Sequence, residues 1–141
     1  MIGGLTNAGE LPVLERLIQF SGQRHRLIAH NIANIDTPDF RPVDVSVGEF
    51  QASLKAAIGE RGTGATTGLR PESGRTIEFT DDGVELRPIP RADNILYHDR
   101  NDRDPERLMQ SMVENFMTFR AAADLFKARL AVINDAIRER I

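Results

Sequence analysis

The acid-rich run at residues 99–104 is the part of the chain that most resembles a ligand site. Asp99-Arg-Asn-Asp-Arg-Asp104 alternates oxygen ligands in the manner of a calcium loop. That loop requires an oxygen ligand at its fifth position, a glycine at its sixth and a bidentate Glu at its twelfth. The corresponding residues are Arg103, Asp104 and Gln110, so the run is interpreted as a solvated linker ending in a helix cap.

Two other groups of residues also lack the pattern of the binding site that they resemble. The glycine-rich run 62–68 lacks the lysine and the strand-loop-helix context of a phosphate loop, so it predicts a flexible loop. His25 and His30 are five residues apart and do not share one helix face, and the chain has no cysteine. No motif suggests a catalytic triad or paired carboxylates. We therefore expect no enzyme activity, no cofactor, no metal and no small-molecule substrate.

Length and charge narrow the class of protein further. The 141 residues fit one domain, and a net charge of −3 argues against nucleic acid as the main partner. No stretch approaches the 18 apolar residues of a membrane span, and residues 1–17 lack the pattern of a secretory signal. Taken alone these features predict a cytoplasmic protein, with export by a route without a cleaved signal left open.

The strongest structural signal is a long helix at the C-terminal end. Asp104-Pro105-Glu106 gives an N-cap, a proline at the first helical position and an acid in the first turn. No proline or glycine follows up to Ile141, which predicts a helix about 55 Å long. Its apolar residues recur at alternating spacings of three and four, which we call the apolar seam: Met109, Met112, Phe116, Phe119, Ala123, Phe126, Leu130, Ile133 and Ile137. A narrow seam of this length requires a second long helix to cover it.

Residues 11–35 supply that second helix. Its predicted stripe is apolar except at the centre, where Ser21 and His25 fill two positions: Leu11, Leu14, Ile18, Ser21, His25, Ile28, Ile32 and Ile35. Pro12 suits the first turn, Thr37-Pro38 predicts the stop, and Asn34 and Asp36 tolerate a left-handed end.

The region between the helices is rich in turn-forming residues. Ile77 and Phe79, then Val84 and Leu86, alternate with polar residues around Asp81-Asp82-Gly83, which predicts a β-hairpin with a three-residue link. Residues 49–58 suit a short helix. The predicted fold is therefore mainly α: long N- and C-terminal helices form a coiled-coil-like hairpin, and a loop-rich middle region with a small β-hairpin is attached at one end. The expected zones of this single unit are 1–40, 41–100 and 101–141.

The difference in length between the two predicted helices suggests a class of function. The C-terminal helix exceeds its partner by about ten residues, or about 15 Å, so part of its seam is bare in a monomer. Bare apolar surface marks an interface. Two classes of protein would cover this bare surface with another copy: a subunit of a self-assembling polymer, or a dimeric coiled-coil adaptor or regulator that closes on itself.

Residues 28–40 carry a motif that favours the polymer. They read Ile-Ala-His-Asn-Ile-Ala-Asn-Ile-Asp-Thr-Pro-Asp-Phe, which resembles the N-terminal signature of the flagellar basal body rod, hook and hook-associated family. Residues 41–50 and 106–117 are similar to the proximal rod proteins of that family, and the resemblance covers about 28–54 and 96–141. Asp39 stands where the family has glycine, a position that Asp can fill because it tolerates a positive φ. Arg100 and Arg103 also depart from the pattern.

The resemblance implies an axial structural protein that polymerises through its terminal helices into the periplasmic rod. It implies assembly with itself, with other rod subunits, with the rod-base adapter protein, the export gate and the membrane ring. It further implies export by the flagellar type III apparatus and a role in motility. The expected assembly interface joins the signature to the seam: Ile28, Asn31, Ile32, Asn34, Thr37, Pro38, Phe40, Met109, Met112, Phe116, Phe119, Phe126, Leu130, Ile133 and Ile137.

Overall fold

The computed structural model describes residues 10–62, 69–90 and 104–139. Most of the glycine-rich run and most of the acid-rich run lie outside these residues. The described elements, in chain order, are α2 (Leu11–Ala33), β1 (Val43–Asp44), α3 (Val47–Gly62), β2 (Ile77–Phe79), β3 (Val84–Leu86), β4 (Ile89–Pro90) and α4 (Pro105–Arg138). The prediction of a mainly helical chain with long terminal helices and a small β-hairpin is confirmed.

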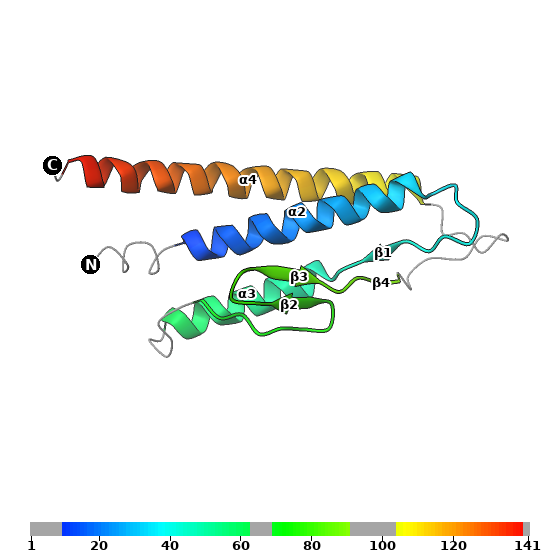
Figure 1. Ribbon diagram of the computed structural model, residues 1–141, viewed down its shortest axis with the longest axis horizontal. Coiled ribbons are helices and arrows are strands. Elements are labelled where there is room, and N and C mark those ends of the chain that lie inside the picture. The colour runs from blue at the N-terminus through cyan, green and yellow to red at the C-terminus, as the bar shows by residue number, and fades with distance from the viewer. Residues whose placement is uncertain (1–9, 63–68, 91–103, 140–141) are drawn as a thin grey trace.

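The elements stack in three layers, with α2 in the middle (Figure 1). The helix α4 lies on one side of α2, and α3 with the β2–β3 hairpin lies on the other. The two long helices run antiparallel, because Arg129 bonds Glu10 at one end while Asn115 bonds Ser21 near the middle. At 34 residues against 23, α4 extends well past the start of α2.

Local sequence signals set the ends of both helices. Pro12 lies in the first turn of α2, as predicted. In α4 the Asp104 carboxylate accepts a hydrogen bond of 3.0 Å from the Arg107 N–H, which confirms the predicted cap. The end of α2 differs from expectation, because Asn34 has a φ of −106° and is not left-handed. The left-handed residue is Asp39, with a φ of 57°.

The hydrophobic core lies between α2, α3 and the β2–β3 hairpin. Its buried members are Phe20, Val45, Phe50, Leu54, Ile77 and Val84. Phe20 stacks on Phe50 with ring centroids 4.0 Å apart, so α2 and α3 meet through parallel aromatic faces. The expectation that the middle region is attached at one end of the helical hairpin is therefore wrong. The region packs along the side of α2 because α2 carries a second apolar face.

The hairpin and the short helix both differ from prediction in detail. Phe79 pairs with Val84, and Thr80 and Gly83 exchange backbone hydrogen bonds, so the link is the two residues Asp81 and Asp82 rather than three. The helix α3 is longer than residues 49–58 at both ends. It starts earlier because Ser46 caps it, accepting a hydrogen bond from the Glu49 N–H. A second antiparallel pair joins β1, which follows α2, to β4, which follows the β2–β3 hairpin.

None of the helices among the described residues is long and apolar enough to cross a membrane.

Candidate assembly interface

Both faces of α2 are covered by other parts of the chain. One face follows the predicted stripe and meets α4, with Leu14, Ser21 and Ile28 buried. The other face meets the core at positions spaced by three and four: Val13, Leu17, Phe20, Arg24, Leu27 and Asn31. Arg24 and Asn31 interrupt the hydrophobic pattern of this second face, so the pattern of the sequence did not predict it.

These two polar residues are satisfied by β1. The Arg24 guanidinium binds the Asp44 carboxylate through both oxygens, at 3.0 and 2.9 Å. The Asn31 amide donates to the Val43 carbonyl at 2.7 Å and accepts from the Val43 N–H at 3.2 Å. Bidentate pairing of this kind fixes position as well as supplying energy. The signature residue Asn31 therefore anchors the strand that follows it, within the chain itself.

The contact between α2 and α4 is close and partly polar. Asn115 is buried and donates from its amide to the Ser21 carbonyl at 2.8 Å. The Ser21 hydroxyl bonds back to the Leu17 carbonyl at 2.6 Å. Gly22 faces Phe119, and a Cβ built at Gly22 would lie 3.7 Å from the ring, an ordinary van der Waals contact. The buried amide of Asn115 thus marks the register of the two helices.

The face of α4 that α2 covers coincides with only part of the predicted seam. Its buried residues are Leu108, Asn115 and Ala122, flanked by the half-buried Met112, Phe119, Ala123 and Phe126. Met109 and Phe116, also assigned to the seam, are exposed. The prediction that one partner helix covers the whole seam is therefore wrong at Met109 and Phe116, because the buried Asn115 and Ala122 turn the helix away from Phe116.

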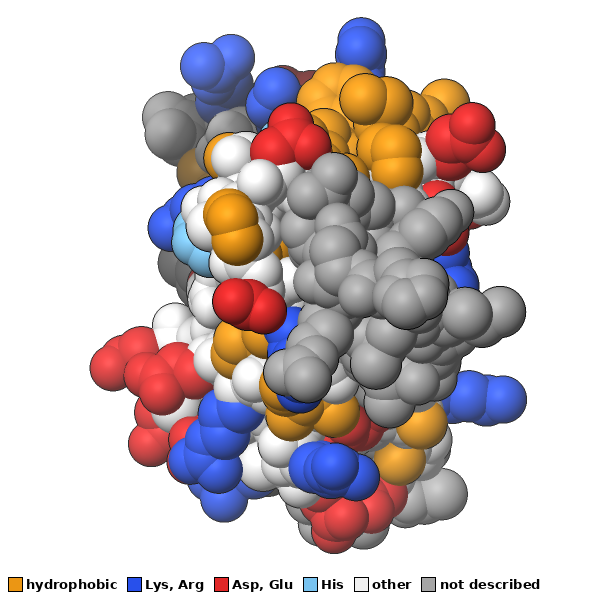
Figure 2. Space-filling view, turned by 90° about the vertical axis from the view of Figure 1, so that its right-hand side faces the viewer, with side chains coloured by type: hydrophobic (Ala, Val, Ile, Leu, Met, Phe, Trp, Pro, Cys, Tyr) orange, Lys and Arg blue, Asp and Glu red, His pale blue; other side chains and the backbone are white. Residues whose placement is uncertain are grey.

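The exposed residues form an apolar surface on the far side of α4, which we call the outer patch. It consists of Met109, Val113, Phe116 and Met117, exposed to 58%, 52%, 48% and 64%. The spacing of four, three and one places them on one helix face. Figure 2 shows hydrophobic side chains gathered over α4 at the top of the molecule. Sequence reasoning missed Val113 and Met117, although their spacing from Met109 was visible.

A second apolar surface lies where α4 passes the start of α2. Glu10, just before α2, pairs with Arg129 at 2.6 Å, and the following turns of α4 project beyond it (Figure 1). We call Leu130, Ile133 and Ile137 the tip. Leu130 is 39% exposed, Ile137 is 48% exposed, and Ile133 is half-buried. All three belong to the expected interface.

The remaining signature residues lie at the end of α2. Ile28 is buried against α4, and Ile32 is half-buried. The Asn34 amide bonds the His30 carbonyl at 2.9 Å. Thr37 and Pro38 are exposed, and the half-buried Phe40 ring lies 5.7 Å from that of His30. Ile28 and Asn31 are thus interior, whereas Thr37 and Pro38 face outward.

A carboxylate network joins α3 to the turn before β2. The Glu49 carboxylate accepts from the Thr76 N–H at 3.0 Å and from its hydroxyl at 2.8 Å. Thr76 in turn accepts from the Ser46 N–H at 3.2 Å. Burial raises the pKa of Glu49, but the hydrogen bonds from Thr76 and Arg75 and the charge of Arg75 outweigh it, so the pKa lies below its ordinary value. Ser46 and Glu49 have the spacing of a capping box, a signal that predicts this start of α3.

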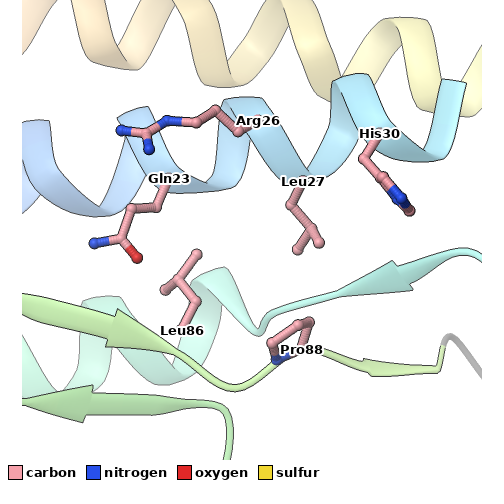
Figure 3. A pocket seen from close by; sticks show the side chains of 6 residues that line it. All are labelled: Gln23, Arg26, Leu27, His30, Leu86 and Pro88. Carbon is pink, nitrogen blue, oxygen red and sulfur yellow. The ribbon is translucent and has the colours of Figure 1, made fainter. Parts of the chain in front are cut away.

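A shallow cavity of about 350 Å³ lies between α2 and the strand β3 (Figure 3). Leu27, Leu86 and Pro88 form its apolar wall, and Gln23, Arg26 and His30 lie along α2. The Gln23 amide is bound to the Val84 carbonyl. No nucleophile or pair of carboxylates lines it, and the described residues contain no cluster that could hold a metal ion. The apolar surfaces of α4 are therefore the stronger candidate site.

Comparison with known proteins agrees with this geometry. The chain is 26% identical over 126 residues to the flagellar basal body rod protein FlgB of Borrelia hermsii, an alignment that covers 87% of this chain and 91% of the relative. This chain resembles a flagellar rod protein over nearly its whole length. The resemblance predicted from residues 28–40 is confirmed, and it supports a structural role in the flagellar rod. No family model matches the chain.

Proposed function

We propose that this chain is a structural subunit of the flagellar basal body rod, most like the proximal subunit FlgB, and that it has no catalytic activity. The observation that carries the proposal is the similarity to a rod protein across 87% of the chain. Two apolar surfaces on α4 supply a physical reason for assembly, because exposed apolar patches of this kind mark contact sites.

The subunit polymerises through its terminal helices into the axial rod that crosses the periplasm. Its partners are further copies, other rod subunits, the rod-base adapter protein, the export gate and the membrane ring. It reaches the rod through the flagellar type III apparatus without a cleaved signal. Within the expected interface, Thr37 and Pro38 and the exposed members of the seam are the residues available to neighbours, since Ile28 and Asn31 are interior.

A gene deletion tests this function directly. Cells that lack the chain are expected to be non-motile and to contain no complete rods in electron micrographs of isolated basal bodies, and the unaltered gene restores both. Normal rods and normal swimming in the deletion strain would exclude the proposal.

The alternative is a dimeric coiled-coil adaptor or regulator. The same apolar surfaces of α4 favour it as a second candidate, because they would also suit a closed dimer. Light scattering of the purified chain separates the two: a sharp, stable dimer at all concentrations supports the adaptor, and concentration-dependent larger oligomers or filaments support the rod subunit.

A further inference from the structure

A two-stranded ribbon, formed by β1 and β4, is attached to α2 mainly through polar side chains. No residue of either strand is buried, and Ile89 is 36% exposed, so apolar contacts hold the ribbon only weakly. The polar contacts come from Arg24 and Asn31 of α2, which are 8% and 1% exposed. These residues lie seven positions apart and therefore project from one face of the helix, about 10 Å from each other along its axis. We call Arg24 and Asn31 the clasp.

The clasp closes the outer edge of β1. Both backbone groups of Val43 bond the Asn31 amide, at 2.7 and 3.2 Å, so they point away from the paired strand β4. Backbone groups alternate in direction along a strand, so the next N–H on this edge is that of Val45. It bonds the Asp44 carboxylate at 2.8 Å, and Arg24 holds that carboxylate in place. The side chains of α2 thus take the position that a third strand would occupy.

Two other strand edges are closed without help from α2. In β4 the residues on either side of Ile89 present their backbone groups away from β1, and both are prolines, which have no N–H. On β2 the Phe79 N–H, which faces away from β3, bonds the Ser73 hydroxyl at 2.9 Å. The edge of β1 differs from these two, because its closure depends on another element.

Opening the clasp would free the edge of β1. Buried backbone N–H and C=O groups without partners are strongly unfavourable, so a ribbon that loses Asn31 is more stable when detached from α2, where water bonds its backbone. A detached β1 presents unpaired donors and acceptors in a row, and such an edge pairs with the same edge of another copy. This association is strand pairing and uses no surface of α4.

We infer that the clasp determines the specificity of self-association: Arg24 and Asn31 keep the edge of β1 closed, so that copies of the chain do not join through their strands. The inference rests on the proposed function, because a subunit that polymerises through its helices must not also polymerise through its strands. A pair of residues with a purely structural role would only lower stability when removed. Removal of the clasp instead creates a new mode of association.

Asn31→Ala in the full-length chain opens the clasp and is the test variant. Asn34→Ala is the matched control, because the Asn34 amide bonds the His30 carbonyl within the end of α2 and not β1. Ile77→Val lowers stability in the core without touching the clasp. The double variant Asn31→Ala with Val43→Pro leaves the clasp open but removes the Val43 N–H from the edge, and the pairing of β1 with β4 does not use this N–H.

The expected result for Asn31→Ala is local release followed by association through strands. Hydrogen exchange at residues 43–45 should be at least about tenfold faster, because two buried hydrogen bonds are lost, while the helical circular dichroism is kept. Thioflavin T fluorescence and light scattering should rise with protein concentration, to at least about fivefold above the unaltered chain. The two controls and the double variant should remain near the unaltered chain in both association measurements. If Asn31→Ala does not fold, Arg24→Lys replaces it and should give a smaller change of the same kind, because lysine keeps the charge but cannot bind both carboxylate oxygens.

Three outcomes would overturn the inference. Unchanged exchange at residues 43–45 in Asn31→Ala would show that the clasp does not hold the ribbon. Equal association of Asn31→Ala and Ile77→Val at matched stability would assign the association to instability alone. Equal association of the single and double variants would place the contact away from the edge of β1.

The deletion experiment keeps this inference separate from the proposed function. If deletion abolishes rods but Asn31→Ala gains no association, the proposed function stands and the role of the clasp does not. If deletion leaves rods intact while Asn31→Ala associates through its strands, the proposed function fails and the closed edge of β1 is supported.

Discussion

The Glu49 carboxylate joins α3 to the turn before β2. The position of this carboxylate depends on the absence of a side chain at Gly74. A Cβ built at Gly74 comes within 1.8 Å of a Glu49 carboxylate oxygen, so any side chain at this position displaces the carboxylate. A free glutamate could move aside at little cost. This one is held by two hydrogen bonds from Thr76, which the displacement would break.

Gly74→Ala is therefore expected to destabilise the protein by about 1–2 kcal/mol, the cost of losing charge-assisted hydrogen bonds at a partly exposed site. Gly59→Ala is the matched control, because Gly59 lies inside α3 with open space around its Cβ position. That change should stabilise the protein by about 0.5–1 kcal/mol through helix propensity. Urea denaturation measures both, and an equal effect of the two changes would contradict the close approach.

The lowered pKa of Glu49 gives a pH dependence with a definite sign. A carboxyl group whose pKa is lower in the folded state stabilises the fold above its unfolded pKa and loses this effect as the pH falls through the folded value. The urea midpoint of the unaltered chain should therefore exceed that of Glu49→Gln at neutral pH. The difference should shrink below the ordinary glutamate pKa of 4.5. A difference that stays constant between pH 7 and pH 3 would show that the Glu49 charge is not involved.

At the scale of elements, the sequence predicted what local chemistry decides. Proline in the first turn and the Asp104 cap fixed where α2 and α4 begin, and alternation located the β2–β3 hairpin. The tertiary pairings could not be predicted in the same way. In the sequence alone, Arg24 is expected to face solvent, and only the structure shows that Asp44, twenty residues later, binds it. Asn115 is likewise expected to lie on the surface, and only the structure places the Ser21 carbonyl opposite its amide. Both residues decide which helix faces are buried.

The docking of α4 on α2 can be tested with two phenylalanines three residues apart. Phe119 is half-buried against Gly22, so Phe119→Asp places a charge between the helices and is expected to cost about 3 kcal/mol. Phe116 is exposed, so Phe116→Asp should change stability by no more than about 0.5 kcal/mol. Urea unfolding followed by circular dichroism gives both values.

The same two variants separate folding from assembly in cells. Phe116→Asp leaves the subunit folded but places a charge in the outer patch, so rods should fail to form from a stable protein. Phe119→Asp should fail through loss of the subunit itself. Normal swimming with Phe116→Asp would remove the outer patch from the assembly interface.

Over the whole molecule, stability is distributed unevenly across the three layers. The helix α2 is covered on both sides, whereas α4 contacts the rest of the described chain mainly through one face (Figure 1). The core residues all come from the part of the chain before α4. A chain built in this way can fold around α2 and leave the outer surfaces of α4 exposed, as the proposed function requires.

This arrangement predicts the hydrogen-exchange pattern of the full chain. In dilute solution the amides of α2 should exchange most slowly, because they are buried between two layers. Residues 130–138 should exchange fastest within α4, because α2 begins at Leu11, beside the Glu10–Arg129 pair, and does not cover them. At high concentration residues 109–117 and 130–138 should gain protection, because these segments carry the exposed apolar side chains that neighbouring copies can cover. Phe116→Asp should abolish the gain at residues 109–117 while leaving α2 unchanged. If the tip were already as protected as α2 in dilute monomer, the tip would be covered within its own subunit and no neighbour would be needed to bury it.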